Sequence, residues 1–220
     1  SPSPTPRRPS SATIQHRPPT SSAMPRPVAV AITGGIGAGK SEALRSFARH
    51  GAAVVSSDEI VHRLLEEDEE VRSALRERWG DRVFRDDGVV MREAIGHIVF
   101  EDPAELAWLE ALLHPRVARE YMAWRSALAR LPEPPTVAVT EVPLLYEVGG
   151  EQRFDVVVAI TAPAELRASR SAMATEDREQ RFLPEEDKAR KADYAFVNDG
   201  SLEDLDTFVA GVLDELEARA

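Results

Sequence analysis

The chain has 220 residues, with 27 lysines and arginines against 38 aspartates and glutamates, and it has no cysteine. A formal net charge of −11 argues against a general nucleic-acid-binding protein, because such a protein needs a broad basic surface. Disulfide and thiolate chemistry are excluded, and no apolar run approaches the roughly 20 residues that a membrane-spanning helix needs. Size and composition fit one α/β domain with an insertion and predict a cytoplasmic enzyme without a membrane partner.

Residues 1–27 differ in composition from the rest of the chain. This segment is rich in Ser, Thr and Pro, holds half of the 16 prolines, and carries four arginines without an acidic residue. It lacks the apolar centre of a secretory signal. An organellar transit peptide is one interpretation, and Met24 is a candidate translation start. We favour a disordered leader, because this composition buries too little apolar surface to fold.

The next segment contains a phosphate-binding motif. Residues 34–41 are Gly34, Gly35, Ile36, Gly37, Ala38, Gly39, Lys40 and Ser41, which match G-x-x-x-x-G-K-[ST]. The apolar, β-branched stretch 28–33 before the motif predicts a buried strand, and the pattern over 42–50 predicts a helix. In that context the backbone N–H groups and the helix N-terminus bind phosphate, and Lys40 reaches the β- and γ-phosphates. Ser41 is a candidate Mg²⁺ ligand, and Glu42 would contact the nucleotide through its backbone.

The sequence therefore predicts a site for a nucleoside triphosphate, ATP in a typical kinase. The alternative is a glycine-rich turn that binds nothing, but such a turn gives no reason for the Lys40-Ser41 pair at its mouth.

Four further strands are expected downstream, at 52–56, 136–140, 154–160 and 194–197. A helix is expected to start at Ser57, residues 71–130 show helical patterning without a convincing strand, and further helices are expected within 164–191 and over 202–220. Together these elements predict an α/β fold with a five-stranded parallel sheet covered by helices on both faces.

Ligands of such sheets bind beyond the carboxyl ends of the strands, so the residues that follow each strand are site candidates. Asp58 follows the second strand, and its carboxylate could accept a proton from an acceptor hydroxyl; the alternative is a helix N-cap. Glu141 follows the third strand and could bind Mg²⁺ through a water, or be an ordinary strand-end charge. Asn198 follows the last strand and would lie near the adenine; the alternative is an Asn-Asp-Gly turn.

Several motifs occur in a fixed order along residues 28–213. They are Thr33 to Ser41, Gly51-Ala52, Ser57-Asp58-Glu59-Ile60, Arg92 through Val99-Phe100, Leu109-Glu110 before His114-Pro115, Pro143-Leu144-Leu145-Tyr146-Glu147 before Phe154-Asp155, and Lys188 before Ala192-Asp193 and Asn198-Asp199-Gly200. In this set the chain resembles the dephospho-coenzyme A kinases, which phosphorylate the ribose 3′-hydroxyl of dephospho-coenzyme A. The P-loop alone is shared by many unrelated NTPases, whereas the ordered set is far more specific.

The resemblance implies a three-layer P-loop kinase domain over 28–220, with a helical substrate-binding insertion at about 60–130 and a helical lid at about 164–191. It implies ATP and Mg²⁺ as cofactors and dephospho-coenzyme A as substrate. Asp58 matches the second acid of the family's Asp-x-Asp motif, while Ser56 replaces the first acid. Arg92 and His114 fall on segments that face the substrate in the family, although Arg92 could instead pair with a carboxylate and His114 could be a packed histidine.

Lid arginines approach the triphosphate in this family. The candidates here are Arg167, Arg170, Arg178, Arg181 and Arg190. We select Arg170 and Arg178 as catalytic. For any one of these arginines, the alternative is a place on a solvated helix, paired with a nearby glutamate.

Two other classes remain open from sequence: another P-loop small-molecule kinase, such as a nucleotide kinase, and a regulatory nucleotide-binding protein. A monomer or weak oligomer that binds no nucleic acid is expected.

Overall fold

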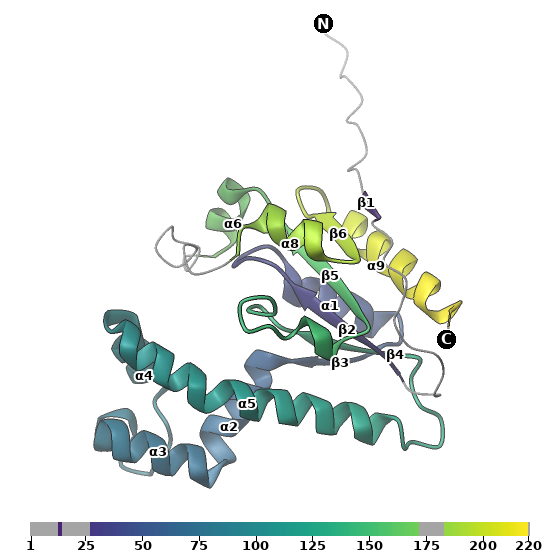
Figure 1. Ribbon diagram of the computed structural model, residues 1–220. Helices are drawn as coiled ribbons and strands as arrows, with labels where there is room; N and C mark the ends of the chain where they lie inside the picture. The colour runs from purple at the N-terminus through teal and green to yellow at the C-terminus, as the bar shows by residue number, and fades with distance from the viewer. Residues whose placement is uncertain (1–12, 15–26, 172–182, 220) are drawn as a thin grey trace, which may run out of the picture. The chain divides into compact units, whose positions relative to one another are not determined.

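The computed structural model describes residues 13–14, 27–171 and 183–219 (Figure 1). The chain divides into two compact units, of which the first comprises Ser1–Val55 and Leu128–Ala220 and the second comprises Ser56–Ala127. Within the described residues, no helix is both long enough and apolar enough to cross a membrane. The predicted bounds of the insertion and of the lid stay predictions.

A parallel sheet forms the centre of the first unit. Its strands are β2 (Val28–Thr33), β3 (Ala53–Ser56), β4 (Val137–Glu141), β5 (Val156–Thr161) and β6 (Tyr194–Val197). Their spatial order is β6-β5-β2-β4-β3, with β2 paired in parallel to both β4 and β5. The residues of β4 and β5 are buried throughout, as expected for strands covered on both faces. The predicted five-stranded parallel sheet is confirmed.

One further strand was not predicted. β1 (Thr13–Ile14) runs antiparallel to β6, with Thr13 opposite Ala195 and Ile14 opposite Tyr194, and extends the sheet to six strands. Both residues belong to the segment predicted as a disordered leader. The other residues of that segment lie outside the described part of the chain, apart from Pro27, so for them disorder stays a prediction.

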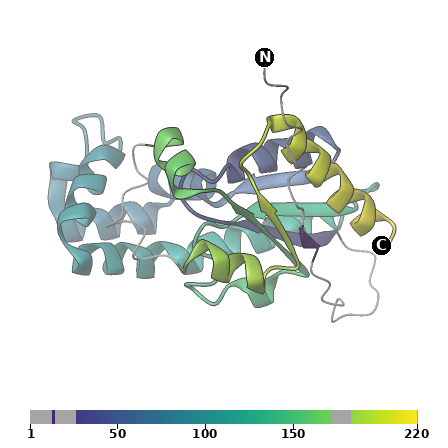
Figure 2. The same cartoon turned by 90° about the horizontal axis from the view of Figure 1, so that it is seen from above.

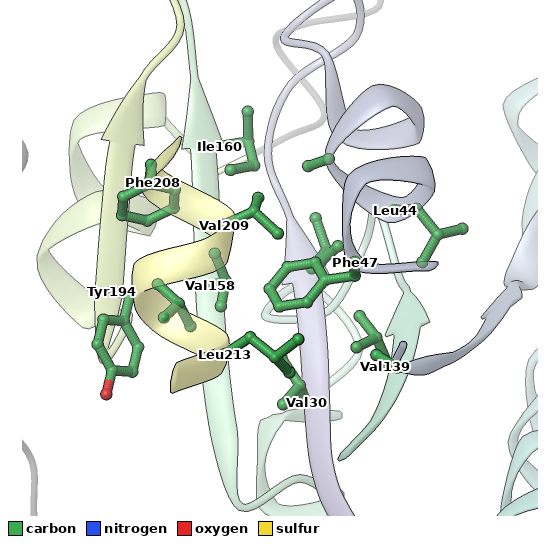
Figure 3. Close-up of a cluster of buried hydrophobic side chains, with 14 of the residues drawn as sticks. Val30, Leu44, Phe47, Val139, Val158, Ile160, Tyr194, Phe208, Val209 and Leu213 are labelled. Carbon is green, nitrogen blue, oxygen red and sulfur yellow. The ribbon is translucent and has the colours of Figure 1, made fainter. Parts of the chain in front are cut away.

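Two helices cover one face of the sheet, α1 (Lys40–Arg49) and α9 (Leu202–Glu217). Figure 3 shows Phe47 of α1 gathered with Val209 and Leu213 of α9 around Val30 of the central strand, and all four residues are buried. α9 begins at a capping box in which Ser201 and Asp204 satisfy each other's backbone N–H groups. This face forms the main hydrophobic core and holds the helix that follows the P-loop.

The opposite face is covered by the segment after β4 and by α8 (Glu185–Lys191). Leu145 and Ala192 pack there against Ala31, Val157 and Ala159, which alternate with the residues of the first face as the strand period requires. Figure 2 shows the yellow α9 and the yellow-green α8 on opposite sides of the sheet. Between β4 and β5 lies the 3₁₀ helix η2 (Glu151–Arg153), and α6 (Ala164–Arg170) follows β5.

The second unit is helical. It contains α2 (Ser57–Glu67), α3 (Glu69–Trp79), the 3₁₀ helix η1 (Gly80–Val83), α4 (Arg92–Glu101) and α5 (Pro103–Leu128). Trp79 packs edge-on against Trp108 with ring centroids 5.0 Å apart, and its indole N–H donates to Glu105 Oε2 over 2.7 Å. The hydrogen bond from Arg78, which has the largest effect, and the one from Trp79 lower the pKa of Glu105. These contacts join α3 to α5 within the unit.

Candidate active site

The P-loop connects β2 to α1 at the carboxyl edge of the sheet. A side chain at Gly34, which has a φ of 147°, would place its Cβ 1.9 Å from the carbonyl oxygen of Ile160, so the loop requires glycine where it passes β5. α1 begins at Lys40. The first backbone N–H groups of a helix have no intrahelical partner, so those of Lys40 and Ser41 lie where a helix binds anions.

Lys40 folds over the loop. Its Nζ donates a hydrogen bond to the carbonyl oxygen of Gly35 over 2.8 Å, and the residue is only 8% exposed. A buried ammonium held by a backbone carbonyl is a preorganised positive charge. The side chain therefore lies along the loop that the sequence predicts to bind phosphate.

Ser41 and Glu141 meet although they are 100 positions apart in the sequence. Ser41 Oγ lies 3.3 Å from both carboxylate oxygens of Glu141, whose residue is 4% exposed. The cause is the register of the sheet, which pairs Glu141 with Ile32 on the central strand just before the P-loop. A hydroxyl beside a buried carboxylate is a pair of hard oxygen donors.

This pair fits Mg²⁺, which binds to one or two protein oxygens and completes its shell with water and substrate phosphates. Within the described residues there is no group of three or more His, Cys, Asp or Glu that could hold a metal. Mg²⁺ in kinases does not need such a cage. Ser41 and Glu141 are therefore the residues that would hold the ion.

Asn198 is used to support the P-loop. It is 4% exposed, and its Nδ2 donates to the carbonyl oxygen of Ala38 over 2.8 Å. The backbone carbonyl oxygen of Asn198 accepts a hydrogen bond from Arg170 Nη1 over 3.0 Å. Asn198 thus links β6, the P-loop and the end of α6, while the expected contact with adenine stays a prediction.

Two residues near the P-loop were not selected as site residues from the sequence: Arg167, which was only one of the candidate lid arginines, and Glu185, which was not named. Arg167, which is 7% exposed, donates from Nε to the carbonyl oxygen of Ala162 over 3.0 Å, and its backbone packs against Gly37. Glu185 reaches the loop from α8: a Cβ at Gly35 would lie 2.5 Å from Glu185 Oε1. No sequence signal brings these positions together, because they are more than 120 residues from the loop.

Arg178, the other selected lid arginine, lies outside the described residues.

Glu42 points its side chain along α1. Its carboxylate forms ion pairs with Arg45 over 2.6 Å and with Arg49 over 3.1 Å. The hydrogen bond from Arg45 is the largest effect that lowers the pKa of Glu42. The side chain is therefore engaged on the surface of its own helix, which leaves only its backbone for the predicted nucleotide contact.

In the second unit, Asp58 is the second residue of α2 and is exposed. The N-cap of this helix is Ser56, whose Oγ accepts a hydrogen bond from the backbone N–H of Asp58 over 3.2 Å. The alternative that Asp58 caps the helix is therefore wrong. Ser56, which replaces the first acid of the motif, performs that role, so the Asp58 carboxylate is not needed as a cap.

Arg92 is the first residue of α4, and its Nη1 lies 3.0 Å from His62 Nδ1. Arginine can only donate, so Nδ1 accepts and the other ring nitrogen carries the proton toward Glu66 Oε1, 3.2 Å away. His114 is half-buried on α5, which continues as a helix through Pro115. Roles of Arg92 and His114 in substrate binding stay predictions.

A parallel α/β sheet, a P-loop with a buried lysine, and a Ser41–Glu141 pair at its end together define a P-loop nucleotide-binding protein. A family model described as dephospho-CoA kinase matches residues 28–204. The chain is 36% identical over 201 residues to the dephospho-CoA kinase of Thermus thermophilus, covering 88% of this chain and 94% of that protein. It is 34% identical over 197 residues to that of Thermobifida fusca, covering 86% and 96%. The chain therefore belongs to the dephospho-CoA kinase family and is an ATP-dependent kinase.

Two solved structures share the fold of this chain. The crystal structure of TT1252 from Thermus thermophilus has a TM-score of 0.68 and 35% sequence identity, and the match covers 87% of this chain and 98% of that one. The dephospho-CoA kinase from Campylobacter jejuni has a TM-score of 0.65 at 23% identity, covering 86% and 97%, and it supports the fold alone.

Proposed function

We propose that this protein transfers the γ-phosphoryl group of ATP to the ribose 3′-hydroxyl of dephospho-coenzyme A, which gives coenzyme A and ADP. The observation that carries the proposal is the meeting of Ser41 and Glu141 at the end of a P-loop with a buried Lys40, in a chain of this kinase family. That arrangement combines a phosphate-binding loop with oxygen ligands for a divalent cation.

Each residue has a distinct task in the proposed reaction. Lys40 and the N–H groups at the start of α1 bind and orient the phosphates and stabilise the charge that develops on them. Asp58 accepts a hydrogen bond from the 3′-hydroxyl, orients it and takes up its proton late in the transfer, since a carboxylate is a weak base at neutral pH. Because Ser56 and not Asp58 caps α2, the Asp58 carboxylate is not used as a cap, which supports this role.

In the proposed reaction, arginines supply positive charge next to the transferred phosphoryl group. We assign Arg170 and Arg178 to the phosphates and Arg92 and His114 to dephospho-coenzyme A. The hydrogen bond of Arg170 to Asn198, which itself holds the P-loop, supports the first assignment. The guanidinium of Arg170 is thus connected to the P-loop through Asn198.

Mg²⁺ completes the proposed site. Ser41 and Glu141 would hold it, and the bound ion would neutralise charge on the β- and γ-phosphates. The P-loop, Glu141 and Asp58 all belong to one chain. We infer a monomer or weak oligomer in the cytoplasm, where ATP is available; light scattering tests the first point.

The deciding experiment measures ADP release with ATP, Mg²⁺ and one of four acceptor conditions: dephospho-coenzyme A, adenosine, AMP, or no acceptor. We expect turnover with dephospho-coenzyme A alone and a new 3′-phosphate in the product by ³¹P NMR. Turnover with AMP instead would favour a nucleotide kinase. Binding of ATP without turnover under any condition would favour a regulatory protein.

A further inference from the structure

Glu185 places a carboxylate against the nucleotide loop. It is the first residue of α8, and a Cβ at Gly35 would lie 2.5 Å from its Oε1 and 2.9 Å from its Cδ. Backbone groups of Gly35 and Ala162 hydrogen-bond this carboxylate. An acidic side chain therefore contacts the backbone of a loop whose chemistry suits phosphate.

Cationic side chains surround the same point. The Cβ position at Gly35 lies 3.1 Å from Arg167 Nη1, and the carbonyl oxygen of Gly35 accepts the hydrogen bond from Lys40. Arg167 and Lys188 both favour the charged form of Glu185. Backbone groups, arginine and lysine around one carboxylate form the environment that binds phosphate oxygens in proteins.

The carboxylate is poorly satisfied as a structural group. Its Oε2 is buried and has no hydrogen-bond partner among the described residues. Burial raises the pKa of Glu185 and is the largest effect on it, even though nearby cations and backbone groups lower it. A buried carboxylate oxygen without a partner costs stability, so packing alone does not explain an acid at this position.

α8 has a fixed point one turn further along. Lys188 is fully buried, and its Nζ contacts Glu147 Oε1 over 2.9 Å and the carbonyl oxygen of Pro143 over 3.2 Å. The carbonyl oxygen of Pro143 also accepts a hydrogen bond from the hydroxyl of Thr33, the last residue before the P-loop. Lys188 can thus hold α8 on the sheet while the side chain of Glu185 changes its position.

We propose that Glu185 occupies part of the phosphate site in the nucleotide-free protein, so that its carboxylate competes with the phosphates of ATP and must leave when they bind. This inference rests on the proposed function, because it takes the P-loop to be the phosphate site. It identifies Glu185 as a residue that lowers the affinity for nucleotide.

The test compares Glu185→Gln with Glu186→Gln, the exposed neighbour on the same helix, as the matched control. Glutamine keeps the size of the side chain and one acceptor oxygen but removes its charge. Isothermal titration calorimetry measures the affinity for ATP and for inorganic triphosphate. The second ligand lacks adenosine and so tests the phosphate site by itself. We expect both ligands to bind Glu185→Gln roughly threefold to tenfold more tightly, since a like charge is removed from beside the phosphates. Glu186→Gln should match the unsubstituted protein.

Equal or weaker binding by Glu185→Gln, with an unchanged melting temperature, would overturn the inference and leave Glu185 as a brace of the P-loop. If the unsubstituted protein bound ATP as expected, the proposed function would survive that result. If it bound neither ATP nor triphosphate, the proposed function itself would fail, and this inference with it. Glu185→Ala is a second variant, and it should also bind more tightly because it too removes the competing charge.

Discussion

At the residue scale, charged groups are buried around the nucleotide loop with specific partners. Lys40, Glu141 and Lys188 are 8%, 4% and 0% exposed, and the structure gives each a contact: Gly35, Ser41 and Glu147, respectively. Burying a charge costs free energy unless it is paired and hydrogen-bonded. Such residues are therefore explained better by phosphate chemistry and by holding the site than by general stabilisation.

Replacing Lys40 with alanine should remove the preorganised charge at the β- and γ-phosphates. We expect kcat/KM to fall by about 10²–10³, or roughly 3–4 kcal/mol of transition-state stabilisation, with the far-ultraviolet circular dichroism unchanged. Near-normal turnover by the folded variant would contradict the assignment of the P-loop.

Asp58 and Ser56 can be separated by one substitution each. Ser56→Ala removes the cap of α2 and should cost about 1 kcal/mol of stability. Asp58→Asn keeps the cap and should stay within about 1 kcal/mol of the parent, while 3′-phosphorylation falls by roughly 10²–10⁴ if the carboxylate acts as base. Melting and activity are measured on the same preparation. Full activity in a stable Asp58→Asn protein would remove Asp58 from the mechanism.

At the scale of elements, one carboxylate ties the P-loop helix to the C-terminal helix. Asp206 on α9 accepts hydrogen bonds from the hydroxyl of Ser46 on α1 and from Arg49 Nη2 over 2.8 Å, and it lies 3.1 Å from His50 Nε2. These three groups, with Ser46 the largest effect, hold the pKa of Asp206 well below its usual range. The contact orients α1, the helix that begins with Lys40 and Ser41.

This contact predicts an acid-dependent loss of stability. A carboxyl whose pKa is lower in the folded state stabilises the fold above its unfolded pKa of about 3.9, and this contribution is lost as the pH falls below that value. Asp206→Asn should therefore lower the melting temperature at pH 7 and show a smaller further loss between pH 4 and pH 2. Asp214→Asn, at an exposed position on the same helix, is the control. Parallel curves for Asp206→Asn and the parent protein would refute this role.

At the scale of the whole molecule, the two-residue strand β1 makes the sheet larger than predicted. Deleting residues 1–23 removes it. The backbone hydrogen bonds of a two-residue strand add only about 1 kcal/mol together, so we expect the melting temperature to stay within about 4 °C and activity to be unchanged. Deletion of residues 1–11 keeps β1 and is the matched control. A larger drop confined to the longer deletion would show that the leader packs on the core.

The sequence by itself determined the class of the protein. Residues 156–160 are all apolar, which suits a strand buried on both faces. The spacing from Gly34 to Ser41 places glycines, lysine and serine where a strand turns into a helix. These are local patterns, and their meaning depends on residues next to one another in the chain. For that reason strands, P-loop and family could be predicted together.

Only the tertiary structure decided which distant residues meet. The contact of Ser41 with Glu141 depends on β4 lying beside β2, and the contact of Glu185 with Gly35 depends on how α8 packs on the sheet. The cap at Ser56 depends on where β3 ends. Strand order, helix rotation and the last residue of a strand are set by packing of segments far apart in sequence, and local residue patterns do not encode that packing.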